Sequence, residues 1–390
     1  MTGRQLLERL QAQGQLGVLD VHFARFLLAR ATHASEELAL GAALVSQATA
    51  QGHVCLDLKT AAGGNLSFGE PQENLPLPAL HQWCEALLRS GVVGQPGDYQ
   101  PLILDTQQRL YLHRYWDYEQ RLGRALAARA RSRVESVDTV TLAASISRLF
   151  NASPGSDTDW QKVAAASSLL RGLTVISGGP GTGKTTTVVR ILALLRQQPG
   201  GEGLRIALAA PTGKAAARLQ EAIQQAGSSL GLPDELWQGI PQSASTLHRL
   251  LGVKSGDSGF HHDAENPLPL DVLILDEASM VDVALMAKLL DALPQACRLI
   301  LLGDKDQLSS VESGAVLGDL CSGCSGISAA FAEELHGLTG EPLSGSGRPA
   351  KPLCDSVVML EHSYRFGRDS PIGRLARAVN QGDAAAAESL

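Results

Sequence analysis

The sequence lacks a long hydrophobic run. No apolar stretch among its 390 residues approaches the ~18 residues that a membrane-spanning helix needs. The amino-terminal residues alternate charged side chains with leucine, unlike the apolar core of a signal peptide. We therefore expect a cytoplasmic protein with no membrane partner.

Positive charge is also in short supply. The chain has 33 lysines and arginines against 40 aspartates and glutamates, a net charge of −7. This balance argues against a protein that coats nucleic acid with a uniformly basic surface, although a motor can bind DNA in a local groove. With 44% hydrophobic residues, the chain is long enough to form two or three domains.

Cysteine is scarce, and its spacing does not complete a zinc site. The six cysteines include one close pair, Cys321 and Cys324, without a second such pair or an HxxxH motif. His336 and Cys354 are the only conceivable additional ligands. Reduced, structural thiols are therefore the favoured interpretation.

Residues 1–150 contain no catalytic motif. Apolar spacing of three and four predicts helices there, Val54–Lys59 resembles a strand, and 101–116 resembles a hairpin. Tyr115 and Trp116 suit base stacking, but burial in a core or a partner contact is the favoured interpretation. We expect a mostly helical accessory domain that docks a partner subunit.

A strand, a glycine-rich loop and a helix follow one another around residue 180. Leu173–Ile176 predicts the strand, and the apolar spacing after Lys184 is helical. Glycines let successive N–H groups converge on one anion, and the helix N-terminus adds partial positive charge. Lys184 is expected to reach the β- and γ-phosphates, and Thr185 to bind Mg²⁺. A chance glycine-rich turn is the alternative.

The nucleotide is expected to contact the whole loop and one residue before it. The predicted loop contacts are Gly178, Gly179, Pro180, Gly181, Thr182, Gly183, Lys184, Thr185 and Thr186. Gln161 lies in a predicted helix before the loop, and its amide has the donor and acceptor that an adenine edge requires. Taken alone, it would be dismissed as a surface glutamine.

Two acids follow the next strong strand pattern. Val272–Leu275 predicts a buried parallel strand, and its carboxyl end carries Asp276 and Glu277. Unpaired carboxylates cost desolvation energy there, so they have few structural reasons to exist. We expect Asp276 to hold Mg²⁺ through water, and Glu277 to orient and deprotonate the attacking water.

Two later segments carry candidate sensors of the nucleotide. Gln307 follows a nearly apolar strand and is placed to sense the γ-phosphate, with an acidic surface turn as the alternative. Arg365 is expected to stabilise charge on a transferring phosphoryl group, and Tyr364 to stack on a base. A surface salt bridge is the alternative for the arginine.

Two further segments suit nucleic-acid phosphates. Pro211, Thr212, Gly213 and Lys214 stand between a buried strand and a helix start, where backbone N–H groups can hold a phosphate. A plain strand-to-helix turn explains these residues equally well. The segment with Thr246 and His248 is expected to face a partner strand or to cap a helix.

Together these motifs resemble those of superfamily 1 DNA helicases, and most closely the RecD family, the alpha subunits of exodeoxyribonuclease V (RecBCD). The motifs are Gln161, GGPGTGKT (178–185), APTGKAA (210–216), STLHRLLG (245–252), DEASMV (276–281), GDKDQL (303–308) and SYRF (363–366).

The resemblance implies ATP-driven 5′-to-3′ movement on single-stranded DNA. It implies a heterotrimer with RecB- and RecC-like subunits that processes double-strand breaks for recombinational repair, with the nuclease centre in another subunit. By the same resemblance, Gln161 reads adenine, Thr185 and Asp276 bind the metal, and Glu277 activates water. Gln307 and Arg365 then sense the γ-phosphate, Tyr364 contacts the base, and the segments at 211–214 and 245–248 line the DNA groove.

The expected architecture is α/β. It comprises the accessory domain (1–150), a RecA-like P-loop domain with a parallel sheet (151–340), a linker (341–352) and the beginning of a second RecA-like domain (353–390). The later helicase motifs of that second domain have no match before Leu390. We therefore expect a carboxyl-terminal truncation that binds nucleotide and unwinds DNA weakly or not at all.

Two other classes of function compete with the motor. One is a P-loop ATPase or small-molecule kinase with no role on DNA, which the presence of Gln307, Tyr364 and Arg365 disfavours. The other is a structural module in which residues 1–145 dock a partner while the nucleotide site is silent.

Overall fold

The computed structural model describes most of the chain between Gly3 and Ser389. The residues that it does not describe are 1–2, 69–72, 151–157, 255, 257–258, 308–312, 325, 346–350, 352, 361, 363, 365–370, 381 and 390. The described part divides into two compact units. Unit 1 runs to Leu122 and takes in the short segments 282–284 and, of the described residues, 313–314; unit 2 comprises the rest.

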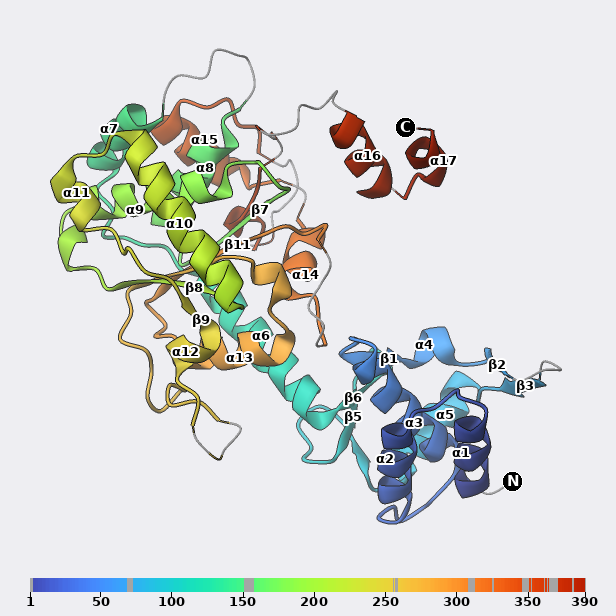
Figure 1. Ribbon diagram of the computed structural model, residues 1–390. Helices are drawn as coiled ribbons and strands as arrows, with labels where there is room; N and C mark the ends of the chain where they lie inside the picture. Colours follow the sequence, from blue (N-terminus) through green and yellow to red (C-terminus); the bar gives the residue numbers. More distant parts are fainter. Residues whose placement is uncertain are drawn as a thin grey trace. The chain divides into compact units, whose positions relative to one another are not determined.

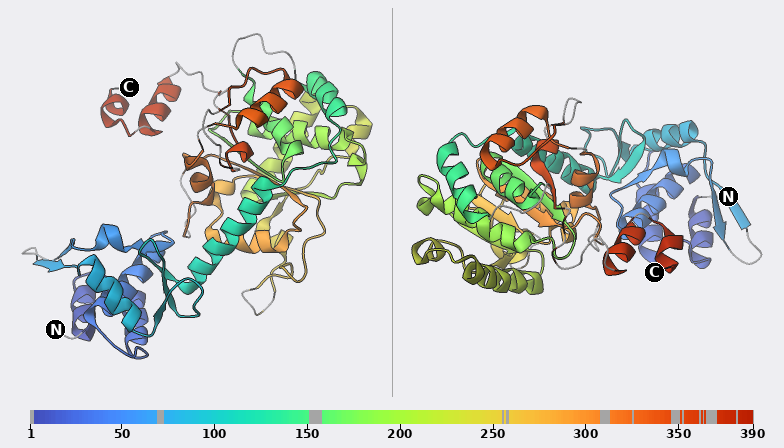
Figure 2. Two further views of the ribbon diagram at one scale, coloured as in Figure 1. Left: turned by 180° about the vertical axis from the view of Figure 1, so that it is seen from behind. Right: turned by 90° about the horizontal axis from the view of Figure 1, so that it is seen from above.

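Unit 1 is mostly helical (Figure 1). Its helices are α1 (Gly3–Ala12), α2 (Val18–Leu28), α3 (Glu36–Ala50), α4 (Leu58–Ala61) and α5 (Leu80–Arg89). Its strands are β1 (Cys55–Asp57), β2 (Asn65–Phe68), β3 (Glu73–Pro76), β4 (Val93–Gly94), β5 (Leu102–Leu104) and β6 (Arg109–Leu112). The long helix α6 (His113–Arg131) follows β6 directly and continues into unit 2 (Figure 2).

Apolar side chains of α1, α2, α3 and α5 build the core of unit 1. Trp83 of α5 is fully buried, and its indole donates a hydrogen bond of 2.9 Å to the carbonyl of Glu37. The predicted hairpin is present as the antiparallel pair β5 and β6, with Gln108 in the left-handed region at φ 65°. Tyr115 is 8% exposed, which agrees with a packed role rather than base stacking. The mostly helical amino-terminal region is thus confirmed.

Unit 2 contains the glycine-rich loop. Its helices are α7 (Thr139–Leu149), α8 (Trp160–Leu170), α9 (Lys184–Gln197), α10 (Gly213–Leu230), α11 (Asp234–Gln238), α12 (Leu247–Leu251), α13 (Val283–Ala292), α14 (Val316–Ser322), α15 (Ala329–Thr339), α16 (Pro371–Asn380) and α17 (Ala384–Glu388), with short 3₁₀ turns η1 (Gly201–Gly203), η2 (Ala278–Met280) and η3 (Cys354–Ser356). Its strands are β7 (Leu173–Gly178), β8 (Ile206–Ala210), β9 (Ser245–Thr246), β10 (Val272–Leu275), β11 (Arg298–Gly303) and β12 (Val357–Leu360).

Among the described residues, six strands form one parallel sheet in the order β12-β7-β11-β10-β8-β9. Every residue of β7 and β10 is buried, as expected for strands covered on both faces. The parallel order means that the loops after β7, β8, β9, β10 and β11 leave from the same edge. The predicted α/β, RecA-like P-loop sheet is confirmed.

The units differ from the predicted domain boundaries in two places. Unit 2 begins at Gly123 rather than near residue 151, because Leu142 and Ile146 of α7 pack into the same core as α8, α9, α10 and α15. At the other end, β12 pairs with β7 and so belongs to the first sheet, although residues 353–390 were expected to begin a second domain. That expectation stays a prediction for α16 and α17. Part of the predicted linker, residues 346–350 and 352, lies outside the described residues.

A buried arginine joins α6 to the end of α13. Arg129 is 2% exposed, and its guanidinium donates to the carbonyls of Leu293 (2.9 Å), Pro294 (3.0 Å) and Cys297 (2.8 Å). Burial lowers the pKa of Arg129. These carbonyl oxygens, which belong to the segment between α13 and β11, accept hydrogen bonds from the guanidinium and so compensate the buried cation. In the described part of the chain, no helix has the length and apolarity to cross a membrane.

We expect Arg129→Met to lower the free energy of unfolding by about 3 kcal/mol, because it leaves several buried carbonyls without a donor. Urea denaturation measures this change. Arg124→Met, on the exposed side of the same helix, is the matched control and should stay within about 0.5 kcal/mol of wild type. Equal stability of the two variants would contradict the role of Arg129.

Candidate functional site

The glycine-rich loop has the backbone geometry of an anion site. Gly181 and Gly183 adopt φ of 79° and 82°, which side-chain-bearing residues rarely adopt. Gly183 is the N-cap of α9 and supplies no side chain to the first N–H groups of that helix. A Cβ at Gly183 would lie 2.2 Å from Nε2 of Gln161 and would displace that amide, so the contact and the positive φ both favour glycine there. The loop thus leaves helix N–H groups available for a phosphate.

Lys184 lies against the loop itself. Its ammonium donates to the carbonyls of Gly178 and Gly179, the latter at 3.2 Å, and the hydroxyl of Thr182 donates to Gly179 at 2.9 Å. These contacts hold the ammonium of Lys184, the one cationic side chain in the loop sequence 178–186, against the loop backbone. A phosphate bound to the N–H groups would offer Lys184 a stronger, charged acceptor than a carbonyl.

The loop borders a cavity of about 530 Å³. Its lining consists of Gly179, Gly181, Thr182, Gly183, Lys184, Thr185, Thr186 and Tyr364. The backbone N–H of Tyr364 donates to the carbonyl of Gly181 at 2.8 Å, and its ring is 65% exposed. The structure therefore brings the predicted base-stacking tyrosine to the loop, whereas Arg365, the next residue, lies outside the described residues.

Gln161 is buried behind the loop rather than exposed. Its Nε2 donates to the carbonyl of Thr182 (2.9 Å), and its Oε1 accepts from Arg190 of α9 (2.9 Å). The N-cap residue Asp159 fixes the start of α8 by accepting from the Gln161 N–H. Both ends of the amide thus brace the loop. The adenine contact stays a prediction, and it requires the amide to exchange one of these partners.

The acid pair stands at the end of β10, as predicted. The pKa of Asp276 is raised to about 6, chiefly by burial; the Glu277 N–H lowers it, the Glu277 carboxylate raises it, and the nearby Lys184 lowers it. The N–H of Glu277 donates to Asp276 Oδ1 at 2.9 Å. Glu277 itself adopts φ 51° and ψ 39°, an uncommon conformation for a residue with a side chain and one that recurs at functional sites.

Gln307 is connected to the acid pair through a serine. The hydroxyl of Ser279, two residues after Glu277, donates to Gln307 Oε1 at 3.1 Å. On the other side, the N–H of Lys305 donates to the hydroxyl of Ser177, at the end of β7. The segment after β11 therefore contacts both the acid loop and the strand that leads into the glycine-rich loop.

The two predicted nucleic-acid segments lie side by side. Strand β9 pairs with β8 through Ala210 and Thr246, so the residues after each strand share one edge of the sheet. Thr212 and Thr246 are the N-caps of α10 and α12, and each accepts a backbone N–H three residues on. Lys214 and His248 are exposed. Two helix N-termini and these side chains form a surface that suits a polyanion.

Two family descriptions match the chain. They are "RecBCD enzyme subunit RecD, N-terminal domain" over residues 12–111 and "AAA domain" over residues 161–313. The chain is 41% identical to RecBCD enzyme subunit RecD of Mycolicibacterium smegmatis, over 94% of this chain and 58% of that protein. It is 36% identical to the subunit of the same name from Haemophilus influenzae, over 97% of this chain and 62% of that protein. The chain belongs to the RecD family.

This RecD-family chain spans about 58% of the length of the first of these relatives. It is also 43% identical to the ATP-dependent RecD2 DNA helicase of Deinococcus radiodurans, over 37% of this chain and 17% of that protein. A solved Pif1 helicase from Candida albicans aligns over 60% of this chain and 46% of its own, with 20% identity and a TM-score of 0.35. The fold assignment rests on the strand order rather than on that score.

Sequence reasoning missed Arg190 in this RecD-family site. Besides its bond to Gln161, its guanidinium lies 4.4 Å from the ring centre of Phe150, and burial lowers its pKa. The available signal was a charge inside an otherwise apolar helix segment, Val188–Leu195. Ser279 was missed because a serine after an acid pair carries no distinctive pattern.

The donor set suits Mg²⁺ better than a protein-enclosed metal. Thr185 offers a hydroxyl at the cavity and Asp276 a carboxylate near Lys184. Mg²⁺ commonly takes one or two protein oxygens and completes its shell with water and phosphate. Across the described ranges, no group of three or more His, Cys, Asp or Glu side chains is arranged to hold a metal.

We expect Asp276→Asn to stabilise the ligand-free protein at neutral pH. The raised pKa means that ionising Asp276 destabilises the fold, so wild type loses stability as the pH rises from about 4 through about 6. The variant should gain on the order of 2 kcal/mol at pH 7.5 and nothing at pH 4. Thermal unfolding across this pH range, with Glu221→Gln on an exposed face of α10 as control, measures the difference. A gain of equal size at both pH values would contradict this account.

Proposed function

We propose that the chain binds ATP with Mg²⁺ and hydrolyses it as the nucleotide-binding part of a RecD-family DNA helicase. The observation that carries the proposal is that Lys184, on the loop after β7, lies close enough to Asp276, at the end of β10, to lower the pKa of that carboxyl. A cation for the phosphates, a metal-binding carboxylate and a candidate base are the groups that phosphoryl transfer to water requires.

Each residue has a separate task in this proposal. Bound Mg²⁺ would neutralise charge on the β- and γ-phosphates, and Thr185 and Asp276 would hold it. Lys184 would turn from the loop carbonyls to the phosphates. Glu277 would accept the proton of the attacking water, and Gln307, held by Ser279, would sense the γ-phosphate. Tyr364 supports a stacking contact with the base, and Gln161 a contact with the adenine edge.

The surface after β8 and β9, at the same edge of the sheet, supports a binding site for single-stranded DNA. The surface with Thr212, Lys214, Thr246 and His248 follows β8 and β9, and β10 with the acid pair is the next strand beyond β8. When the contacts of Asp276 or Glu277 change on hydrolysis, a movement of β10 can therefore be passed through the adjacent strand β8 to the proposed DNA surface. We propose that hydrolysis drives 5′-to-3′ movement on single-stranded DNA through this coupling.

Unit 1 supports a role in assembly. Its match to the amino-terminal domain of a RecBCD subunit covers residues 12–111, and the sequence there carries no catalytic motif. We propose that it docks RecB- and RecC-like subunits in a heterotrimer that acts on double-strand breaks during recombinational repair.

Lys184→Ala should weaken Mg²⁺–ATP binding at least about tenfold and abolish measurable hydrolysis, because the lysine contributes several kcal/mol of phosphoryl stabilisation. Titration with a fluorescent ATP analogue and a phosphate-release assay measure the two effects. Lys59→Ala, an exposed lysine of α4, is the control and should bind like wild type. Unchanged binding by the Lys184 variant would contradict the nucleotide assignment.

Lys214→Ala should weaken binding of labelled oligo-dT by about threefold to tenfold and lower the slope of log affinity against log salt by about one, because one phosphate contact is lost. Fluorescence anisotropy at several salt concentrations measures both, again with Lys59→Ala as control. If oligo-dT neither binds nor raises the ATPase rate of wild type, an ATPase without a DNA role replaces the motor, while the nucleotide assignment stands.

A further inference from the structure

Cysteines far apart in the sequence meet between α14 and η3. Cys321 and Cys324 lie at and just after the end of α14, and Cys354 begins η3. The thiol of Cys354 donates to the carbonyl of Gly323 at 3.8 Å, beside the backbone of Cys324. The side chains of Cys324 and Cys354 are within hydrogen-bonding reach of each other. All three cysteines are free thiols in this structure.

The contacts distinguish which thiols form a pair. Cys321 is 7% exposed, and its thiol interacts with the hydroxyl of Ser177, at the end of β7. Cys324 is less buried, and its thiol faces Cys354 while donating to the carbonyl of Leu320 at 3.6 Å. Cys324 therefore shares a side-chain hydrogen bond with Cys354, whereas Cys321, although near, bonds to Ser177.

We propose that Cys324 and Cys354 are a redox-active dithiol that a peroxide converts to an intramolecular disulfide. The Cys324 thiolate attacks one peroxide oxygen, the O–O bond breaks, and a sulfenic acid and one water result. The Cys354 sulfur then attacks the Cys324 sulfur, the S–S bond forms, and a second water leaves. Two thiols lose two electrons and two protons, and one hydrogen peroxide becomes two waters.

The surroundings make this reaction slow at neutral pH. The pKa of Cys324 is raised to about 12, chiefly by burial and then by the neighbouring Cys354 and Cys321, while Lys351 lowers it. Because the thiolate is the nucleophile, the rate of cross-linking should rise about tenfold for each pH unit between 7 and 9. The dithiol therefore suits a response to sustained oxidation rather than a rapid sensor.

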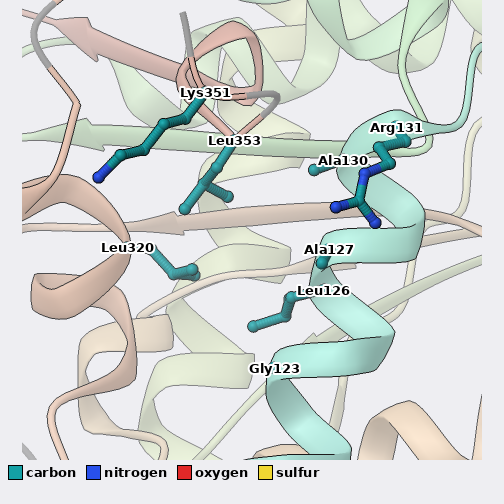
Figure 3. A pocket seen from close by; sticks show the side chains of 8 residues that line it. All are labelled: Gly123, Leu126, Ala127, Ala130, Arg131, Leu320, Lys351 and Leu353. Carbon is teal, nitrogen blue, oxygen red and sulfur yellow. The ribbon is translucent and has the colours of Figure 1, made fainter.

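The disulfide would join α14 to η3, the turn that leads into β12. Cys354 is followed by Asp355, whose carboxylate accepts from Arg171 (2.7 Å) and from the Ser328 hydroxyl (2.9 Å), and then by β12, which pairs with β7. Leu320 and Leu353, each adjacent to one of the three cysteines, face α6 across an apolar pocket of about 230 Å³ (Figure 3). The cross-link would thus hold α14 and η3 together on one side of this pocket.

The test is oxidation of the whole chain with hydrogen peroxide, followed by alkylation in denaturant and mass spectrometry. Trypsin cannot separate the cysteines, because Arg348 and Lys351 both precede proline. Cleavage after Glu334 separates Cys354 from Cys321 and Cys324. We expect four alkylated cysteines instead of six and a cross-linked peptide that contains Cys354.

Single variants identify the partner. Cys321→Ser should keep the cross-link, and Cys324→Ser should lose it, with Cys84→Ser of α5 as an unrelated control that keeps it. Oxidised wild type should also melt on the order of 5 °C above the reduced form, and a reductant should reverse the shift. Six free thiols after oxidation of folded wild type, or a disulfide between Cys321 and Cys324, would overturn the proposal.

Discussion

The parallel register of β7, β11 and β10 is the constraint on which the candidate site depends. Ser177 of β7 pairs with Gly303 of β11, and Leu301 of β11 pairs with Leu275 of β10. These pairings align the strand ends, so the glycine-rich loop, the segment with Gln307 and the acid pair all begin at the same edge. A shift of one register position would separate Lys184 from Asp276, and the proposed hydrolysis of ATP depends on their proximity.

Two buried charges of the same unit show how differently a fold can compensate desolvation. Arg129 is surrounded by carbonyl oxygens of the segment between α13 and β11, which replace much of the hydration that it loses. Asp276 accepts one backbone N–H, from Glu277, whose own carboxylate lies nearby. The cation is thus compensated by the fold, whereas the acid is left partly uncompensated. A bound divalent cation would supply the compensation that Asp276 lacks, which supports the proposed role of this residue in metal binding.

The glycine-rich loop is held by side-chain contacts on its protein side, and its other side borders the cavity. Gln161 connects Thr182 of the loop with Arg190 of the loop helix, and a side chain at Gly183 would collide with that amide. On the cavity side, the Tyr364 N–H contacts Gly181. The loop is therefore held by two segments, one before it and one well after it in the chain, which restricts its motion without occupying its N–H groups.

Much of the site could be predicted from the sequence alone, because its chemistry resides in short contiguous motifs. The strand, loop and helix around Lys184, the acids after Val272–Leu275, and the hairpin before α6 all follow from local spacing, glycine content and turn chemistry. The parallel α/β fold follows as well, since apolar strands that alternate with helices have few other arrangements.

Tertiary structure alone decided how distant segments meet. The pairing of β12 with β7, the contact of Arg190 with Gln161, the link from Ser279 to Gln307 and the meeting of Cys324 with Cys354 join residues between 28 and 182 positions apart. Local patterns specify which face of an element is apolar, but not which partner covers it. That choice depends on the packing of all elements at once, and therefore the unit boundary and the thiol pair emerged only from the folded chain.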